Sequence, residues 1–265
     1  MLLQLALSVL AAMVAVMLCA WAFGLATRNG GWTDVFWTWG TGATLTAAAA
    51  WAASEADDWR VWLVPAMTAA WGLRLGLYLT PRVAGHPEDR RYAAFRQGDP
   101  KAYPMTMLFV SLPQAPAAAL LAVSPLAAVL YPPAWIHRYE LGLALFLVAL
   151  AGEAVADGQM KRFRADPANK GKVIDTGLWA WSRHPNYFFQ WLGWMAWPVI
   201  ALDPARPVTW LTLVAPAVMY ALLRYVSGVP PLESAMLESR GEAFRDYQRR
   251  VSVFFPLPPK RASAA

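Results

Sequence analysis

Long apolar runs alternate with short polar connections along most of this chain. A transmembrane helix needs roughly 20 predominantly apolar residues, and seven runs approach or exceed that length, the sixth being the shortest. The first run has no positively charged start and exceeds the apolar core of a signal peptide, so we expect it in the mature protein. The pattern predicts an all-α integral membrane protein with seven transmembrane helices: Leu2 to Ala26, Thr33 to Ala53, Trp59 to Thr80, Met105 to Leu130, Trp135 to Met160, Asn186 to Leu202 and Val208 to Val226.

Composition supports this fold class. The chain has 265 residues, of which 58% are hydrophobic and 15% are charged, whereas an ordinary soluble domain is roughly 45–50% apolar. Cys19 is the single cysteine, so no disulfide forms within the chain. The three histidines are scattered, and we predict no metal site. We expect one seven-helix domain over residues 1–255 and a disordered tail over residues 256–265.

Basic residues predict the orientation in the membrane. Lys and Arg are retained on the cytoplasmic side of membrane proteins, and here they gather in the third and fifth connections and after Arg224. Only Arg60, Arg138 and Arg206 fall in the connections on the opposite side. We therefore predict a bacterial inner-membrane protein with a cytoplasmic C-terminus, a lipid bilayer as partner and a monomer in preference to a dimer. The net charge of +6 then needs no nucleic acid partner.

The stretch from Gly177 to Gln190 is the most informative part of the sequence. Pro185 suits the first turn of a helix, and an apolar run follows it at once. A helix that begins there directs backbone N–H groups and the positive end of its dipole outward, next to Arg183 and His184, which favours a phosphate. Alternatively, Arg183 and His184 anchor the helix among lipid headgroups.

Charged residues inside predicted spans are functional candidates, because a membrane normally excludes them. Trp71, Arg74 and Tyr78 in the third span have the spacing of one helix face. We predict that they line a pocket, although Arg74 can instead extend to the interface. Asp34, one residue into the second span, is either a catalytic acid or a helix N-cap.

A second polar stripe runs along the fifth span. Glu153, Asp157, Lys161 and Arg164 follow one another at four, four and three residues. The functional interpretation is that Asp157 accepts hydrogen bonds from a cofactor while Lys161, Arg164 and Lys172 contact its phosphates. The alternative is a ladder of ion pairs within the helix.

Two further polar segments lie in cytoplasmic connections. The loop from His86 to Tyr92 either closes over a ligand or is a solvated turn with its own ion pairs. After the seventh span, Gly228, Pro230 and Pro231 break the helix, and the following stretch to Arg250 has helical spacing. We expect this helix, which carries Glu233, to lie along the membrane surface.

These motifs together resemble the bacterial branch of the steroid 5-alpha-reductase family from about Asp34 to Pro256. The Arg-His-Pro core is also shared with membrane methyltransferases of the isoprenylcysteine carboxyl methyltransferase type, but Asn186 after the proline favours the reductases. The resemblance rests on Gly177-Leu178-Trp179, Ser182-Arg183-His184-Pro185-Asn186-Tyr187, Trp71-x-x-Arg74-Leu75, Glu88-Asp89-x-Arg91-Tyr92 and Pro231-Leu232-Glu233.

The resemblance implies a membrane enzyme that transfers hydride from NADPH to the beta carbon of an enone, typically the 4,5 double bond of a 3-oxo steroid. It also implies that the dinucleotide contacts Asp157, Arg164, Lys172, Asn186, Arg224 and Glu233. We add the neighbouring Lys161, Arg183, His184 and Tyr187 to this predicted cofactor site.

On the substrate side, the resemblance implies roles for Arg74 and Tyr78, and we predict that Trp37 and Trp71 contact the substrate. The acid-bearing Gln-Glu-x-Pro motif of the animal members is absent, and the family's tyrosine one turn before the arginine falls at Trp71. We therefore assign Asp34 as the substitute acid.

The predicted chemistry suits such a site. Hydride addition places negative charge on the enone oxygen, so a donor must point at it in a water-free pocket. We expect Asp34 or Tyr78, with Arg74 nearby, to supply that donor. The alternative function is an S-adenosylmethionine-dependent methyltransferase. A transporter is disfavoured because the polar residues collect at the cytoplasmic ends of the spans and not at mid-membrane.

Overall fold

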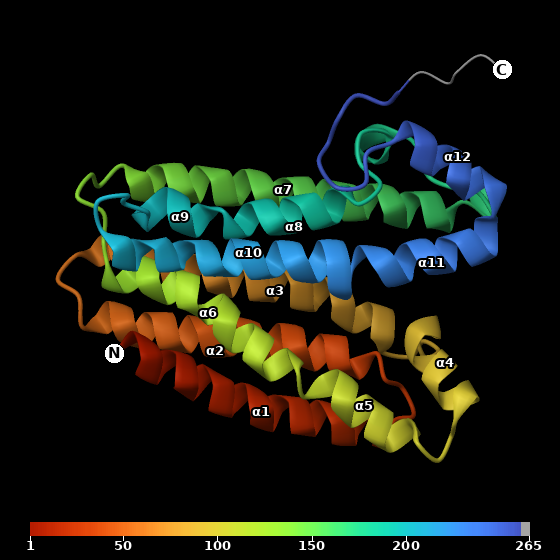
Figure 1. Ribbon diagram of the computed structural model, residues 1–265, viewed down its shortest axis with the longest axis horizontal. Coiled ribbons are helices and arrows are strands. Elements are labelled where there is room, and N and C mark those ends of the chain that lie inside the picture. Colours follow the sequence, from red (N-terminus) through yellow and green to blue (C-terminus); the bar gives the residue numbers. More distant parts are fainter. Residues whose placement is uncertain (261–265) are drawn as a thin grey trace. The chain divides into compact units, whose positions relative to one another are not determined.

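The computed structural model describes residues 1–260, apart from the side chains of Arg90 and Arg91 (Figure 1). The described residues form helices and no β-strand, so the all-α prediction is confirmed. Residues 261–265 of the predicted disordered tail lie outside the described residues. Within its first half, the Leu257 N–H donates to the Trp181 carbonyl (3.0 Å) and the Lys260 N–H to the Arg250 carbonyl (2.9 Å).

The helices follow one another along the whole described chain. In order they are α1 (Leu2–Ala26), α2 (Trp32–Ser54), η1 (Trp59–Trp62), α3 (Leu63–Val83), α4 (Arg90–Gly98), α5 (Tyr103–Ser111), α6 (Gln114–Leu130), α7 (Arg138–Ala165), η2 (Pro167–Asn169), η3 (Gly177–Ala180), α8 (Pro185–Trp194), α9 (Ala196–Ala201), η4 (Pro207–Leu213), α10 (Val214–Ala221), the π-helical turn η5 (Leu222–Val226), α11 (Val229–Arg240) and α12 (Glu242–Arg250).

Four helical stretches in the described chain are long and apolar enough to cross a membrane: Leu2–Ala26, Tyr103–Leu130, Arg138–Ala165 and Pro207–Arg240. They correspond to the first, fourth, fifth and seventh predicted spans, and they indicate a membrane protein. The other predicted spans are also helical, in α2, in η1 with α3, and in α8 with α9. Because α8 has 10 residues and α9 has 6, these helices are short for a span. Seven spans therefore stay a prediction.

The chain divides into two compact units. The first comprises Met1–Leu143 with Trp197–Val218, and the second comprises Ala144–Ala196 with Met219–Ala265. The single domain predicted for residues 1–255 stays a prediction, because one domain can consist of two compact units.

In the first unit, α2 packs against α1 and α3, and α1 packs against α6. Glycines allow the closest approach, since a Cβ atom added at Gly42 would lie 2.8 Å from the Cα atom of Gly72. Trp39 covers Gly76 in the same way, and its indole N–H donates to the Thr80 hydroxyl (3.0 Å). Small residues of this kind permit close backbone packing between membrane helices, where lipid removes the hydrophobic drive for association.

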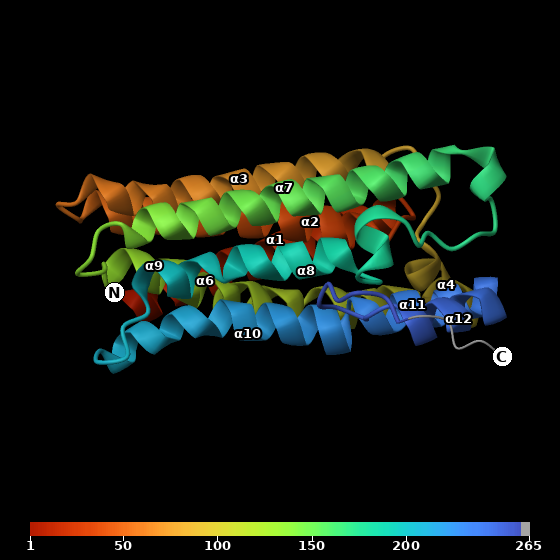
Figure 2. The same cartoon turned by 90° about the horizontal axis from the view of Figure 1, so that it is seen from above.

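In the second unit, α7 and α8 lie side by side and antiparallel (Figures 1 and 2). A Cβ atom at Gly152 would collide with the ring of Phe189, and one at Gly193 would lie 3.6 Å from the Cβ of Ala149. As the position on α8 increases, the facing position on α7 decreases by the same step. This register places the first turn of α8 level with the part of α7 that follows Gly152.

The C-terminal segment of the second unit is helical, but as two helices and not as the single helix predicted up to Arg250. Gly241 separates α11 from α12 with a φ of 53°, a left-handed conformation that glycine adopts without steric penalty. Phe244, Tyr247 and Val251 then form a buried cluster. The Tyr247 hydroxyl donates to the carbonyl of Trp179 (2.6 Å), which ties α12 to η3.

Candidate functional site

The start of α8 is the centre of the candidate site in the second unit. His184 is the N-cap residue and Pro185 occupies the first helical position, so the predicted helix start is confirmed. The Phe188 N–H already donates to the His184 carbonyl (3.0 Å), while the earlier backbone donors of Asn186 and Tyr187 belong to the open first turn. This geometry favours an anion or a polar ligand group at the helix end.

A carboxylate cluster holds the residues before α8. Glu233 accepts two hydrogen bonds from Arg183, at 2.7 and 3.2 Å, one from Gln248 at 2.7 Å, and one at the Nε2 atom of His184 at 3.1 Å. Arg183 also donates to the carbonyls of Gln248 (3.2 Å) and Val251 (2.6 Å). We call these four side chains the Glu233 cluster. The cluster brings together three residues that were predicted to bind the cofactor: Arg183, His184 and Glu233. Two of them, Arg183 and Glu233, bind each other in this structure.

His184 is neutral in this cluster. Burial lowers its pKa below the ordinary value, against the opposing effect of the Glu233 carboxylate. The ring stacks on that of Tyr187, with centroids 5.4 Å apart and planes inclined by 8°. Because Glu233 only accepts, the tautomer consistent with this contact carries its proton on Nε2. His184 and Tyr187 thus form one wall at the opening of α8.

Asp157 of α7 and Asn186 of α8, which were both predicted to bind the cofactor, are in contact with each other. The Asn186 amide nitrogen donates to Asp157 Oδ1 at 3.3 Å. Asp157 is 5% exposed, and Glu153, one turn earlier on α7, is 5% exposed as well. The polar stripe of α7 is therefore buried at one end and reaches exposed residues at the other, where Lys161 and Arg164 stand.

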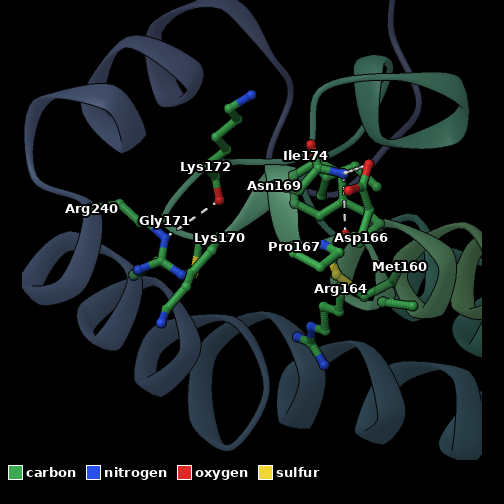
Figure 3. Close-up of a pocket in the computed structure, with 13 residues that line it drawn as sticks. Met160, Arg164, Asp166, Pro167, Asn169, Lys170, Gly171, Lys172, Ile174 and Arg240 are labelled. Atoms are coloured by element: carbon green, nitrogen blue, oxygen red, sulfur yellow. Dashed lines mark hydrogen bonds between the residues drawn. The ribbon is translucent and has the colours of Figure 1, made fainter.

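A hollow of about 360 Å³ lies at that exposed end (Figure 3). Its walls come from the end of α7, the connection that contains η2, and the last turns of α11. Apolar side chains form one part of the lining, among them Met160, Phe163 and Met236. We call this space the basic hollow, because its charged lining residues are Arg164, Asp166, Lys170, Lys172 and Arg240.

The basic hollow carries a surplus of positive charge. Its one carboxylate, Asp166, is occupied within the turn, where it accepts the Ala168 N–H (2.9 Å) and the Asn169 amide (3.4 Å). Arg240 is oriented by the carbonyl of Lys172, which accepts from its Nε at 3.3 Å. Among the residues that the structure describes, no carboxylate forms an ion pair with Lys170, Lys172 or Arg240.

The three residues predicted to contact phosphates, Lys161, Arg164 and Lys172, differ in their position relative to the basic hollow. Arg164 and Lys172 both line it, but the Lys172 side chain is directed away from those of Lys170 and Arg240 (Figure 3). Lys161 is exposed and does not line it. Lys170 and Arg240 line the hollow but were not among the site residues predicted from the sequence. The sequence could have indicated Lys170, because it lies between the predicted contacts Arg164 and Lys172. It could not have indicated Arg240, which comes from the distant helix α11.

Arg224 lies elsewhere in the second unit, in the π-helical turn η5. Its guanidinium carbon is 5.0 Å from the ring centre of Tyr225, and its charge contributes to the lowered pKa of His184. Short π-helical segments are frequent at functional sites. Arg224 therefore belongs to the surroundings of the α8 start and not to the basic hollow.

In the first unit, Asp34 has a specific partner. The hydroxyl of Tyr92, from α4, donates to Asp34 Oδ1 at 2.8 Å. Asp34 is the third residue of α2, whose N-cap is Gly31, so the N-cap alternative for Asp34 is wrong. The side chain of Asn29 accepts the Gly31 N–H (3.0 Å) there. The sequence contained Tyr92 in a motif but did not indicate this contact.

The predicted substrate residues of α2 and α3 lie near one another. The Arg74 guanidinium carbon is 5.4 Å from the ring centre of Tyr78, as the spacing of one helix face predicts. The rings of Trp37 and Trp71 meet edge to face with centroids 6.2 Å apart. The Trp37 indole nitrogen is buried, and within the described residues it has no hydrogen-bond partner. The Trp37 indole N–H is therefore able to donate a hydrogen bond to an acceptor on a ligand.

The loop from His86 to Tyr92 is held by its own contacts. Glu88 accepts the Gly30 N–H (2.7 Å), two bonds from Arg96 (3.1 and 3.2 Å) and the Tyr103 hydroxyl (2.5 Å). Burial alone would raise the pKa of Glu88, but these donors outweigh it and hold the pKa below its ordinary value. We call this the Glu88 cluster. It favours the interpretation of the loop as a turn stabilised by ion pairs.

Comparison with known proteins places the chain in a family without assigning an activity. The model of a family described as "Protein of unknown function (DUF1295)" matches residues 20–251. No curated protein and no solved structure matches the chain. Since the family match covers most of the sequence, the chain belongs to the protein family DUF1295.

Proposed function

We propose that this protein is a membrane-embedded reductase that uses NADPH to reduce the carbon–carbon double bond of a lipophilic enone, such as a 3-oxo-4-ene steroid. The observation that carries the proposal is the basic hollow at the end of α7, the helix that also carries the buried Asp157, to which Asn186 of α8 donates a hydrogen bond. The family to which the chain belongs includes steroid 5-alpha-reductase-like proteins, which supports the proposal.

The basic hollow suits one phosphorylated end of a dinucleotide in chemistry and in size. A volume of about 360 Å³ is near the lower end of small-molecule sites, which span roughly 300–1,000 Å³, and suits one end of such a ligand. Arg164, Lys170 and Arg240 would bind a phosphate there, because a guanidinium and an ammonium pair strongly with phosphate oxygens. Asp157 of α7 and Asn186 of α8 would accept and donate hydrogen bonds to another part of the ligand.

The residues proposed to act on the enone lie in α2 and α3. NADPH, when bound, supplies a hydride for the beta carbon of the enone. Asp34 or Tyr78 would donate to the oxygen on which charge develops, and Arg74 would stabilise that charge. Tyr92 would hold Asp34 in place through the 2.8 Å bond. Trp37 and Trp71 would contact the apolar body of the substrate and exclude water.

The proposal includes the membrane arrangement predicted from the sequence: seven spans, a cytoplasmic C-terminus, the bacterial inner membrane and a monomer. The four apolar helical stretches support a bilayer environment. A Cys-accessibility experiment on intact cells tests the topology. Cysteines introduced at Lys170 and at Arg206 should be labelled from opposite sides of the membrane. Labelling of both from the same side contradicts the seven-span arrangement.

A methyltransferase that uses S-adenosylmethionine is the second candidate, favoured by the Arg-His-Pro helix start beside Glu233. Thermal-shift titration in detergent with NADPH, NADH and S-adenosylmethionine separates the two. A ligand at a hundred times its dissociation constant stabilises the protein by roughly 2.7 kcal/mol. We expect NADPH to stabilise it most. Stabilisation by S-adenosylmethionine alone overturns the reductase.

Point variants assign the roles of the two units. Arg164→Gln should weaken NADPH binding about tenfold or more, because it removes a charged contact to phosphate. Arg162→Gln is the matched control, since it removes the same charge from the same last turn of α7 outside the lining of the hollow. Asp34→Asn and Tyr78→Phe should preserve NADPH binding and lower the rate of reduction.

A further inference from the structure

Gln190 contains a buried acceptor that the protein itself does not use. It lies in α8, four residues after Asn186 and so on the same helix face, and it is 7% exposed. Its Oε1 atom is enclosed and has no hydrogen-bond partner in the part of the chain that the structure describes. Buried amide oxygens are nearly always paired in native proteins. A ligand that donates a hydrogen bond explains the exception.

The register of α7 and α8 locates this acceptor relative to the proposed nucleotide contacts. Asn186 pairs with Asp157, and Phe189 covers Gly152. Gln190 is therefore level with Gly152, one helical turn or about 6 Å beyond the Asp157–Asn186 pair. Arg164 of the basic hollow lies about 10 Å from Asp157 in the opposite direction along α7. The three positions follow one line along the second unit.

The chemistry of the acceptor selects the ligand group. Gln190 is neutral and buried, and such an acceptor matches a neutral donor, since a buried ammonium requires a carboxylate. Gln190 is level with Gly152, and the carboxylate nearest to that position on α7 is Glu153. Glu153 already has a partner of its own. Among the parts of NADPH, the primary carboxamide of the nicotinamide ring provides the neutral N–H donors at the end remote from the 2′-phosphate.

We propose that Gln190 accepts a hydrogen bond from the nicotinamide carboxamide and thereby orients the ring of the bound cofactor. This inference rests on the proposed function, because it requires a pyridine nucleotide in the second unit. It adds a cofactor-orienting residue that lies beyond the predicted set. It also predicts selectivity at the carboxamide, which the basic hollow cannot provide.

Nucleotide analogues test the contact directly. The 3-acetylpyridine analogue of NADP⁺ keeps the pyridine ring and the 2′-phosphate, but an acetyl group replaces the carboxamide and its N–H donors. Isothermal titration of the wild-type protein in detergent should show NADP⁺ binding about tenfold or more tightly than this analogue. Gln190→Met, of similar length, should bind both with nearly equal affinity. Gln190→Glu, which keeps an acceptor, should retain the preference for the carboxamide.

The fragment 2′,5′-ADP, which lacks the nicotinamide, serves as the control ligand. Its affinity should be unchanged in Gln190→Met, which shows that the variant is folded and the basic hollow intact. Where Gln190→Met does not fold, the wild-type preference and Gln190→Glu still decide the question. Equal wild-type affinities for NADP⁺ and the analogue, or a preference that survives in Gln190→Met, overturn the role of Gln190 alone. Absence of binding by both NADP⁺ and 2′,5′-ADP overturns the proposed function together with it.

Discussion

The two units each contain a largely buried carboxylate that ties distant segments together, and the two clusters differ in the burial of the arginine that binds it. Glu88 in the first unit joins the start of α2 to α4 and α5, and Glu233 in the second unit joins the residues before α8 to α12. Each carboxylate accepts two bonds from an arginine. The Arg96 side chain is 34% exposed, whereas that of Arg183 is 10% exposed.

This difference determines what each cluster contributes. A partly exposed ion pair adds little, because water screens it and competes for its donors. A buried pair has lost its hydration, so removal of one partner leaves an uncompensated charge. The Glu233 cluster therefore has to remain intact for the start of α8 to keep its geometry. The Glu88 cluster is the more tolerant of the two and restrains a surface connection.

The largest effect should come from Glu233→Ala. The substitution leaves Arg183 and His184 buried without their acceptor, and we expect a loss of about 3–5 kcal/mol in the free energy of unfolding. Chemical denaturation in detergent measures it. Glu238→Ala, at an exposed position of the same helix, is the control and should change stability by less than about 0.5 kcal/mol. Similar losses in both variants contradict the role given to the Glu233 cluster.

Glu88→Ala should have a smaller effect. It leaves the Gly30 N–H and the Tyr103 hydroxyl without an acceptor, while the more exposed Arg96 regains water. We expect a loss of about 1–3 kcal/mol, measured in the same way. Glu55→Ala, an exposed position of the same unit, is the control. A loss that equals or exceeds that of Glu233→Ala removes the distinction between the clusters.

Single neutral donors provide a matched comparison. Gln248→Leu removes one bond to Glu233, and Tyr103→Phe removes one bond to Glu88. Each should lower the free energy of unfolding by about 1.5 kcal/mol, because a neutral donor is lost from a charged acceptor. The two values should agree more closely than those of the carboxylate variants. A several-fold difference would show that burial affects every bond of a cluster and not only its charges.

The smallest expected effect is a dependence of the melting temperature on pH, which distinguishes the two clusters. His184 has a pKa lowered below 6.5 by burial, and the Glu88 pKa is lowered below 4.5 by its donors. For both groups the unfolded chain takes up the proton first, so the stabilisation is present above these values and is lost as the pH falls. The melting temperature should therefore decrease below about pH 6.5 through His184 and again below about pH 4.5 through Glu88.

Two variants assign these steps. His184→Gln should abolish the decrease between pH 7 and pH 5 and leave the lower one in place, since glutamine does not titrate. Glu88→Gln should weaken the decrease at the lower pH and preserve the upper one. A melting temperature that is constant from pH 7 to pH 5 in the wild-type protein is incompatible with a buried neutral His184.

The sequence by itself determined the helical class and most helix positions. The first predicted span has the same bounds as α1, and Pro185 marked the start of α8. Such features depend on apolar runs and on backbone chemistry, which are local properties. The fourth predicted span coincides with the apolar helical stretch Tyr103–Leu130, within which Leu112 and Pro113 separate α5 from α6. Proline cannot donate the N–H that would continue the helix, but Pro125 inside α6 and Pro81 inside α3 interrupt no helix, so the sequence did not locate this break.

Only the tertiary structure decided which side chains meet. Tyr92 reaches Asp34 over 58 residues, and Arg183 reaches Glu233 over 50. Arg240 completes the basic hollow from a helix far from Arg164 in the chain. Many polar residues of this sequence are possible partners for one another, and local periodicity does not choose among them. The choice follows from the antiparallel packing of α7 and α8 and from the reversal at Gly241, which position the donors around each acceptor.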